Sequence, residues 1–97
     1  MAGRSEISRR NEEEPRFARE RRRLGLCLRR LRDERELTQE QAAEKIGMHP
    51  IHLGRIEGGR ENVTLATLIA ISEAYRVPIR ALFEGDGEQG AKSGRRQ

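Results

Sequence analysis

Hydrophobic positions recur at helical spacing along this chain, and no segment shows the strict alternation of a β-strand. The first hydrophobic stripe lies within residues 15–35 and consists of Phe17, Leu24, Leu28 and Leu31. It predicts an amphipathic helix, and Pro15 suits its first position because a helix needs no amide hydrogen there. Gly25 weakens the middle of this helix, so we expect the helix to begin late, near residues 18–22.

A pair of short helices follows, over residues 38–47 and 49–58. Thr38 and Gln41 have the spacing of a capping box, in which each side chain binds a free amide at the start of the helix. Gly47 ends that helix. Two helices joined by a three-residue turn form a helix-turn-helix, whose second helix can enter the major groove of DNA.

The second helix of this pair begins with Pro50 at its first helical position. Its hydrophobic residues Leu53 and Ile56 have the spacing of an inward face. With that register, the residues expected to point away from the domain are Pro50, Ile51, His52, Gly54 and Arg55.

The remaining pattern predicts two further helices. Thr64 caps a fourth helix, and Val63 and Leu68 have the spacing of a hydrophobic staple. Pro78 begins a last short helix, whose packing residues are Ile79, Leu82 and Phe83. The chain is therefore expected to form an all-α domain of five helices.

The composition limits what such a domain can contain. Ninety-seven residues with 34% hydrophobic content build one small core and leave no room for a large internal ligand pocket. The single Cys27 excludes an intramolecular disulfide, and its leucine neighbours predict a packed thiol rather than a catalytic one. No apolar run approaches ~20 residues and no hydrophobic signal segment is present, so we expect a cytoplasmic protein.

The net charge of +4 comes from the two ends of the chain. Residues 1–23 hold eight arginines against five acidic residues, whereas residues 24–84 are neutral. We expect a disordered segment over residues 1–15, a domain over 16–84 and a disordered tail over 85–97. The N-terminal arginines either reach along the DNA backbone or into the minor groove, or they remain solvated.

Three motifs occur in order: TQEQAAEKIG in the second helix, RIEGG at the end of the third, and the terminal LF. With them, residues 24–84 resemble a lambda repressor/Cro-type helix-turn-helix domain, often called the XRE family. One such motif alone is weak, and all of them at this spacing are specific. The resemblance implies a five-helix lambda repressor-like fold and a transcription factor that binds DNA as a dimer.

The resemblance implies one phosphate contact and one structural ion pair. Gln39 corresponds to the family's phosphate-clamping glutamine, at a helix N-terminus that already favours an anion. Arg32 and Glu57 match a pair that ties the first helix to the recognition helix. That pair is either exposed and worth little, or buried, so that removing one partner costs about 3–5 kcal/mol.

The resemblance also places Pro50, Ile51 and Arg55 where the family reads base edges. Arg55 either binds guanine O6 and N7 with its planar fork or contacts a phosphate or a nearby acidic residue. Ile51 either touches a thymine methyl or completes the core. Further DNA contacts are expected from Thr38, His49, His52 and Arg60, and a dimer contact from Ile79, Leu82 and Phe83.

Four residues depart from the family's pattern. Ala42 replaces a usual leucine, which predicts a less filled core, and His49 replaces serine or threonine, which predicts a poorer helix cap. Gly54 replaces a polar contact residue and allows a close approach to the duplex. Glu36 occupies a turn position often held by glycine, which predicts a tighter or differently bent corner.

The sequence thus predicts a nucleoid-associated regulator that binds double-stranded DNA as a homodimer at a near-palindromic operator, similar to controller proteins of restriction–modification systems. The alternative is an antitoxin-like or adaptor module whose main partner is a protein, either a toxin or polymerase. No nucleophile–base set indicates an enzyme. His49 and His52 lack the further ligands that a metal needs, and we expect no cofactor, no membrane contact and no small-molecule ligand.

Overall fold

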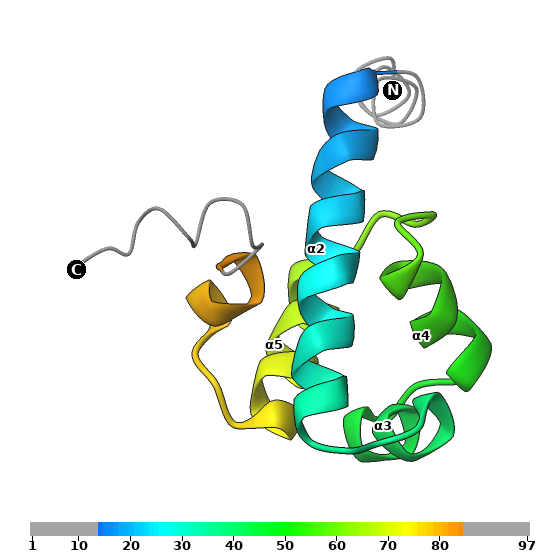
Figure 1. The fold of residues 1–97 in the computed structure, drawn as a ribbon, viewed down its shortest axis with the longest axis vertical. Coiled ribbons are helices and arrows are strands. Elements are labelled where there is room, and N and C mark those ends of the chain that lie inside the picture. Colours follow the sequence, from blue (N-terminus) through cyan, green and yellow to red (C-terminus); the bar gives the residue numbers. More distant parts are fainter. Residues whose placement is uncertain (1–13, 85–97) are drawn as a thin grey trace.

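The structure is a computed structural model that describes residues 14–84; the tails expected to be disordered fall almost entirely on residues 1–13 and 85–97, outside that range. The described residues form four α-helices, one 3-10 helix and no strand. In chain order (Figure 1) these are α2 (Pro15–Glu34), α3 (Gln39–Ile46), α4 (Pro50–Glu57), α5 (Leu65–Tyr75) and η1 (Ile79–Phe83). The all-α class is confirmed, whereas the fifth helix is a 3-10 helix, a form suited to so short a segment.

The long helix α2 is the element around which the others pack (Figure 1). It contacts α4 on one side and η1 on another, while α5 packs against α3 and η1. The first turns of α2 project beyond the rest of the domain (Figure 1). The helix-turn-helix pair, α3 and α4, therefore lies to one side of α2, where α4 keeps an outer surface.

The core is one cluster drawn from every element. Its buried hydrophobic members are Leu24, Cys27, Leu28, Leu31, Ala42, Ala43, Leu53, Ile56, Ile71, Tyr75 and Leu82. Leu24, Leu28 and Leu31 of the first predicted stripe are among them, and so are the predicted Leu53 and Ile56, so the periodicity located the inward side of α2 and α4 correctly. Phe17, the first residue of that stripe, is only partly buried and is not part of the cluster. Val63 and Leu68, the predicted staple, pack against the cluster while remaining partly exposed.

Helix α2 begins at Pro15, so the expectation of a late start near residues 18–22 is wrong. The expectation treated Gly25 as a weak point in the helix. Gly25 is instead buried, and a Cβ atom there would collide with the carbonyl oxygen of Glu57 at the end of α4. The glycine lets the backbones of α2 and α4 touch, and the packing that results offsets its low helix propensity.

The predicted caps of α3 and α5 are confirmed. The Thr38 side chain accepts from the amide of Gln41 at 3.0 Å, and the Gln41 side chain accepts from the amide of Thr38 at 2.9 Å. Thr64 accepts from the amide of Thr67 at 3.1 Å. Gly47 ends α3 in the left-handed conformation, with φ of 96°, which starts the turn into α4.

Cys27 lies where α2 meets η1, as a buried side chain. Its Sγ atom lies 3.0 Å from the carbonyl oxygen of Glu84 and 3.3 Å from that of Ala81, and Arg30 donates to it at 3.3 Å. Burial raises the pKa of the thiol, and the charge of Arg30 opposes that rise. The thiol therefore packs η1 onto α2, as its leucine neighbours predicted.

Two residues that are not glycine adopt left-handed backbone angles. Glu36 has φ of 57° in the corner between α2 and α3, and Arg76 has φ of 59° at the end of α5. Glu36 stands where the family often has glycine. The corner thus keeps a conformation that glycine adopts freely, and the chain bears the steric cost of a Cβ atom.

Replacing Glu36 with glycine should stabilise the fold. The left-handed angle costs a residue with a Cβ atom about 1–2 kcal/mol, and glycine removes that cost. Glycine also has greater backbone freedom in the unfolded chain, which lowers the stability of the fold by ~0.5–1 kcal/mol and offsets part of the gain. We expect Glu36→Gly to raise the free energy of unfolding by about 0.5–1 kcal/mol in urea denaturation. Glu36→Ala, which keeps the Cβ atom, is the control, and equal stabilities of the two variants would contradict the explanation.

Candidate nucleic-acid interface

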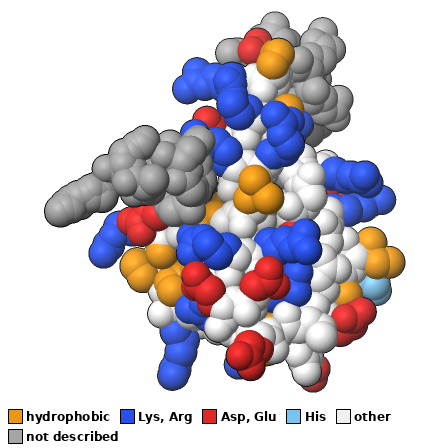
Figure 2. Space-filling view, viewed as in Figure 1, with side chains coloured by type: hydrophobic (Ala, Val, Ile, Leu, Met, Phe, Trp, Pro, Cys, Tyr) orange, Lys and Arg blue, Asp and Glu red, His pale blue; other side chains and the backbone are white. Residues whose placement is uncertain are grey.

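The outer face of α4 presents hydrophobic and basic side chains to solvent. Ile51 is 65% exposed and Arg55 is also exposed, whereas Pro50 is half-buried at the start of the helix. Figure 2 shows a hydrophobic patch beside a histidine at the right-hand edge, where α4 lies in Figure 1. Because Ile51 is so exposed, it does not complete the core, and that alternative is excluded.

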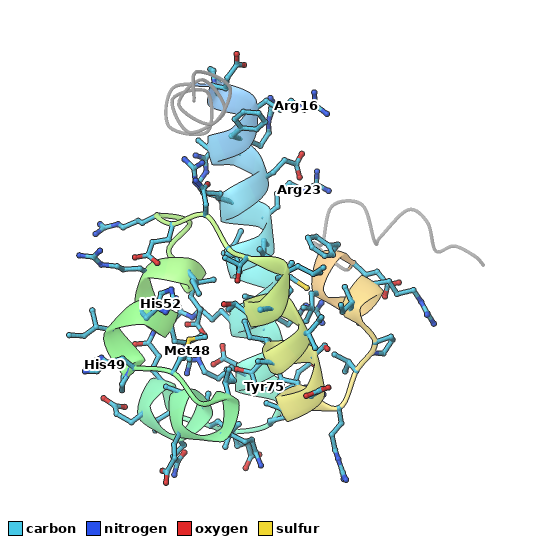
Figure 3. All side chains as sticks on the ribbon, turned by 180° about the vertical axis from the view of Figure 1, so that it is seen from behind. Arg16, Arg23, Met48, His49, His52 and Tyr75 are labelled. Carbon is cyan, nitrogen blue, oxygen red and sulfur yellow. The ribbon has the colours of Figure 1, made fainter. Side chains whose placement is uncertain are left out.

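His49 caps α4 with its own side chain. Its Nδ1 atom accepts from the amide of Ile51 at 3.1 Å, which satisfies one of the free amides at the start of the helix. The expectation of a poorer cap is therefore wrong: an imidazole nitrogen takes the place of a hydroxyl oxygen. Figure 3 shows His49 and His52 on the α4 side of the domain.

The other side of α4 is fixed by a buried ion pair. The Arg32 guanidinium donates to both carboxylate oxygens of Glu57, at 2.8 Å through Nε and 3.0 Å through Nη2. The side chains are only 11% and 4% exposed. The third arm, Nη1, donates to the carbonyl of Leu37 at 2.9 Å. One guanidinium thus joins α2, the corner before α3 and the end of α4, a bidentate geometry that only arginine supplies.

The ion pair changes the pKa values of Arg32 and of the neighbouring Tyr75. Hydrogen bonding to Glu57 raises the pKa of Arg32, with burial opposing the rise. Tyr75, buried next to the pair, has its pKa raised to about 12, first by burial and then by the charge of Glu57. Arg35 lies over the Tyr75 ring, 5.3 Å from its centre, and donates to the Tyr75 carbonyl at 2.8 Å. Arg32 therefore stays positively charged and Tyr75 stays neutral at neutral pH.

Gln39, the expected phosphate clamp, joins the same network. Its Nε2 atom donates to Oε1 of Glu57 at 3.0 Å, so the side chain is held at the N-terminus of α3. A Cβ atom at Gly54 would lie 3.4 Å from the Gln39 side-chain oxygen. The prediction for Gly54 assumed that its missing side chain admits the duplex; within the protein, that space adjoins Gln39.

One residue that contacts this surface was not predicted from the sequence: Glu61, in the loop after α4. Its Oε1 atom lies 2.9 Å from Nε2 of His52 and its Oε2 atom lies 3.3 Å from Nη1 of Arg55. The nearby acidic residue left open as a partner of Arg55 is this one. Glu61 follows Arg55 by six residues, outside the helical pair spacing, so no periodic signal pointed to it.

The arginines of α2 point in several directions. Arg21 donates to the carbonyl of Gly59 at 3.4 Å and to Asn62 at 3.2 Å, which ties the start of α2 to the loop after α4. Arg16 and Arg23 point away from the α4 side (Figure 3). Lys and Arg side chains gather along the upper part of the face in Figure 2. Arg60, predicted to contact DNA, is exposed in the loop after α4.

The three residues expected at a dimer contact differ in exposure. Phe83 is 56% exposed and Ile79 is partly exposed, so both are accessible to another chain. Leu82 is 0% exposed, because it faces the core shared with α2 and α5. Leu82 is therefore a core residue, and its assignment to a contact surface is corrected.

Between residues 14 and 84, no three histidine, cysteine or carboxylate side chains come together as metal ligands. No helix in that part of the chain is long and apolar enough to cross a membrane.

Comparison with known proteins gives a consistent result. A family described as a helix-turn-helix domain matches residues 23–84. The control protein C.SmaI of Serratia marcescens is 38% identical over 66 residues, which cover 65% of this chain and 79% of that protein. The immunity repressor protein of Bacillus phage phi105 is 37% identical over 59 residues, 61% of this chain but only 41% of the repressor.

A solved structure shows the same fold. The restriction–modification controller protein C.AhdI from Aeromonas hydrophila is similar with a TM-score of 0.64 and 32% sequence identity. The similarity covers 65% of this chain and 96% of the controller. The first turns of α2, before residue 23, lie outside the segment that the family match covers.

The buried ion pair leads to a stability prediction. Glu57→Ala leaves Arg32 charged and without its carboxylate, so the free energy of unfolding should fall by about 3–5 kcal/mol in urea denaturation. The double variant Arg32→Met/Glu57→Leu removes both charges and should recover most of that loss. Glu73→Ala, at an exposed acid of α5, is the control. A loss below ~1 kcal/mol for Glu57→Ala would show that the pair behaves like a surface pair.

Proposed function

The chain belongs to the helix-turn-helix domain family, as a regulator of the lambda repressor/Cro (XRE) type, and from this premise we propose that it binds duplex DNA sequence-specifically as a homodimer. The observation that carries the proposal is the division of α4 into two faces. One face is fixed by the Arg32–Glu57 pair, and the other exposes Ile51 and Arg55. An exposed, rigidly held helix of this kind fits the major groove.

Base reading is assigned to the first two turns of α4. The exposed Ile51 is suited to contact with a thymine methyl, and Pro50 makes apolar contact only, because it has no donor. Arg55 is suited to guanine, whose O6 and N7 atoms match two donors of a guanidinium. His52 lies one turn before Arg55 and shares its partner Glu61.

Phosphate binding is assigned to the ends of the helix-turn-helix. Gln39 lies at the start of α3, where backbone amides favour an anion, and its contact with Glu57 holds it in place. Thr38 caps the start of α3 and His49 caps the start of α4. The exposed Arg60 extends this surface past the other end of α4. Such contacts position the protein on any duplex and leave the choice of sequence to α4.

Two copies would bind one operator. In dimeric helix-turn-helix proteins the recognition helices enter successive major grooves about 34–36 Å apart, which requires a near-palindromic site. The exposed Phe83 and the partly exposed Ile79 are the side chains of η1 that are accessible to a second copy. Similarity to two control proteins supports a role at a promoter, with regulation through access or recruitment of polymerase.

A protein partner is the second candidate, and one observation favours it. Helix α5 exposes Leu65 at 65% and Ile69 at 39%, one helical turn apart. Salt separates the two kinds of partner. Affinity for DNA falls steeply as salt rises, because cations condensed on the phosphates are released on binding. A contact made through Leu65 and Ile69 would not show that dependence.

Arg55 should determine one base pair in each half-site. After selection of bound sequences from a random duplex pool, Arg55→Ala should lose preference at that base pair, a discrimination of about 1–3 kcal/mol. Arg55→Lys is the matched control: it keeps the charge and the affinity for unrelated DNA but lacks the planar fork. If Arg55→Ala keeps the full preference, Arg55 does not read that base.

Gln39 should contribute affinity without sequence preference. Gln39→Ala removes a phosphate contact and should weaken binding to selected and unrelated duplexes by the same factor in fluorescence anisotropy titrations. Its denaturation curve is measured alongside, because the variant also loses the bond to Glu57. A loss confined to one base pair would contradict the phosphate role.

A further inference from the structure

Building on the proposed function, we infer that Glu61 is a specificity-determining residue that positions Arg55 for base reading and lowers the affinity for unrelated DNA. The observation behind it is a carboxylate between two side chains of the recognition helix. Each carboxylate oxygen contacts one of them: Oε1 lies 2.9 Å from Nε2 of His52, and Oε2 lies 3.3 Å from Nη1 of Arg55. An acidic group next to a phosphate-binding surface opposes phosphate binding, and this carboxylate is directed at the two side chains of α4 instead.

The loop that carries Glu61 is fixed at several points. The amide of Arg60 donates to the carbonyl of Arg55 at 2.9 Å, which folds the loop back onto α4. Gly59 has φ of 73°, and a Cβ atom there would lie 2.8–2.9 Å from Arg22 on α2. On the other side, Asn62 accepts from Arg21 at 3.2 Å. The loop is thus attached to α4 before Glu61 and to α2 after it.

The contact to Arg55 uses one edge of the guanidinium. Only Nη1 meets Glu61, so the rest of the planar group remains available for guanine. The side chain of Glu61 is only 27% exposed, compared with 60% for Arg55. A long exposed arginine samples many rotamers, and a fixed partner at one edge reduces that freedom before DNA arrives. Glu61 therefore acts on DNA through Arg55.

His52 completes the arrangement. Its Nε2 atom lies 2.9 Å from Oε1 of Glu61, so each carboxylate oxygen of Glu61 has a partner on α4. The carboxylate of Glu61 compensates the charge of Arg55, whose Nη1 atom lies 3.3 Å from it. A phosphate on unrelated DNA is therefore attracted less than Arg55 alone would attract it, whereas guanine still finds a positioned donor pair.

Two substitutions separate positioning from charge. Glu61→Ala removes both, and Glu61→Gln removes the charge while keeping the length and one acceptor oxygen. Both should tighten binding to unrelated duplexes, by up to about tenfold near 0.1 M salt, and steepen the salt slope by about one. Only Glu61→Ala should lose discrimination at the base pair read by Arg55, by about fivefold or more.

Controls use the same selected duplex and its single-base variants. Glu73→Ala makes the same charge change on α5 and should leave discrimination unchanged. In an Arg55→Ala background, Glu61→Ala should cause no further loss of discrimination, because its effect passes through Arg55. Thermal denaturation of every variant confirms that the comparison is between folded proteins.

The outcomes distinguish this inference from the function on which it rests. If the unaltered protein selects no preferred sequence, the proposed function fails and the role of Glu61 fails with it. If the unaltered protein selects a site and Glu61→Ala tightens binding with full discrimination, only the positioning role is overturned. The inference is supported if Glu61→Ala loses discrimination, Glu61→Gln keeps it, and Glu61→Ala causes no further loss in the Arg55→Ala background.

Discussion

A single buried carboxylate, that of Glu57, fixes the geometry on which DNA binding would depend. It receives two bonds from Arg32 on α2 and one from Gln39 at the start of α3, while it belongs to α4. The Glu57 carboxylate thus fixes the relative positions of three helices, and removing it would leave the buried charge of Arg32 without a partner. Burying such a pair is a weak source of stability, but its two bonds from Arg32 and the bond from Gln39 fix how α2, α3 and α4 meet at Glu57.

The same helix is held from outside by a second carboxylate. Glu57 is buried and fixes the position of α4 in the domain, while Glu61 is partly exposed and sets the side chains that α4 presents. Close backbone packing supports both, since Gly25 brings α2 against the end of α4. These contacts therefore hold in place the eight-residue helix α4 and the loop that follows it.

Much of this arrangement was predictable, because it is encoded locally. Helical spacing gave the inward faces, the Thr38–Gln41 spacing gave a cap, and family motifs gave the Arg32–Glu57 pair. The features that were not predicted depend on contacts between residues far apart in the sequence. Gly25 was interpreted as a weak point because its neighbour Glu57 lies 32 residues away. Leu82 was assigned both to packing and to a dimer contact, because a short segment has no periodicity that separates core from surface, and only the packing role agrees with its burial. Glu61 went unnoticed for the same reason as Gly25: its partners meet it only after the loop folds back onto α4.

We propose that the protein binds DNA through the outer face of α4. The most direct measurement is an NMR titration of isotope-labelled protein with a duplex carrying its selected site. We expect the largest changes in amide chemical shift, and line broadening, at Gln39, Ile51, His52 and Arg55. Intermolecular contacts to bases are expected at the same residues. Changes confined to α5 and η1, with α4 unaffected, would contradict it and would instead indicate a surface for a protein partner.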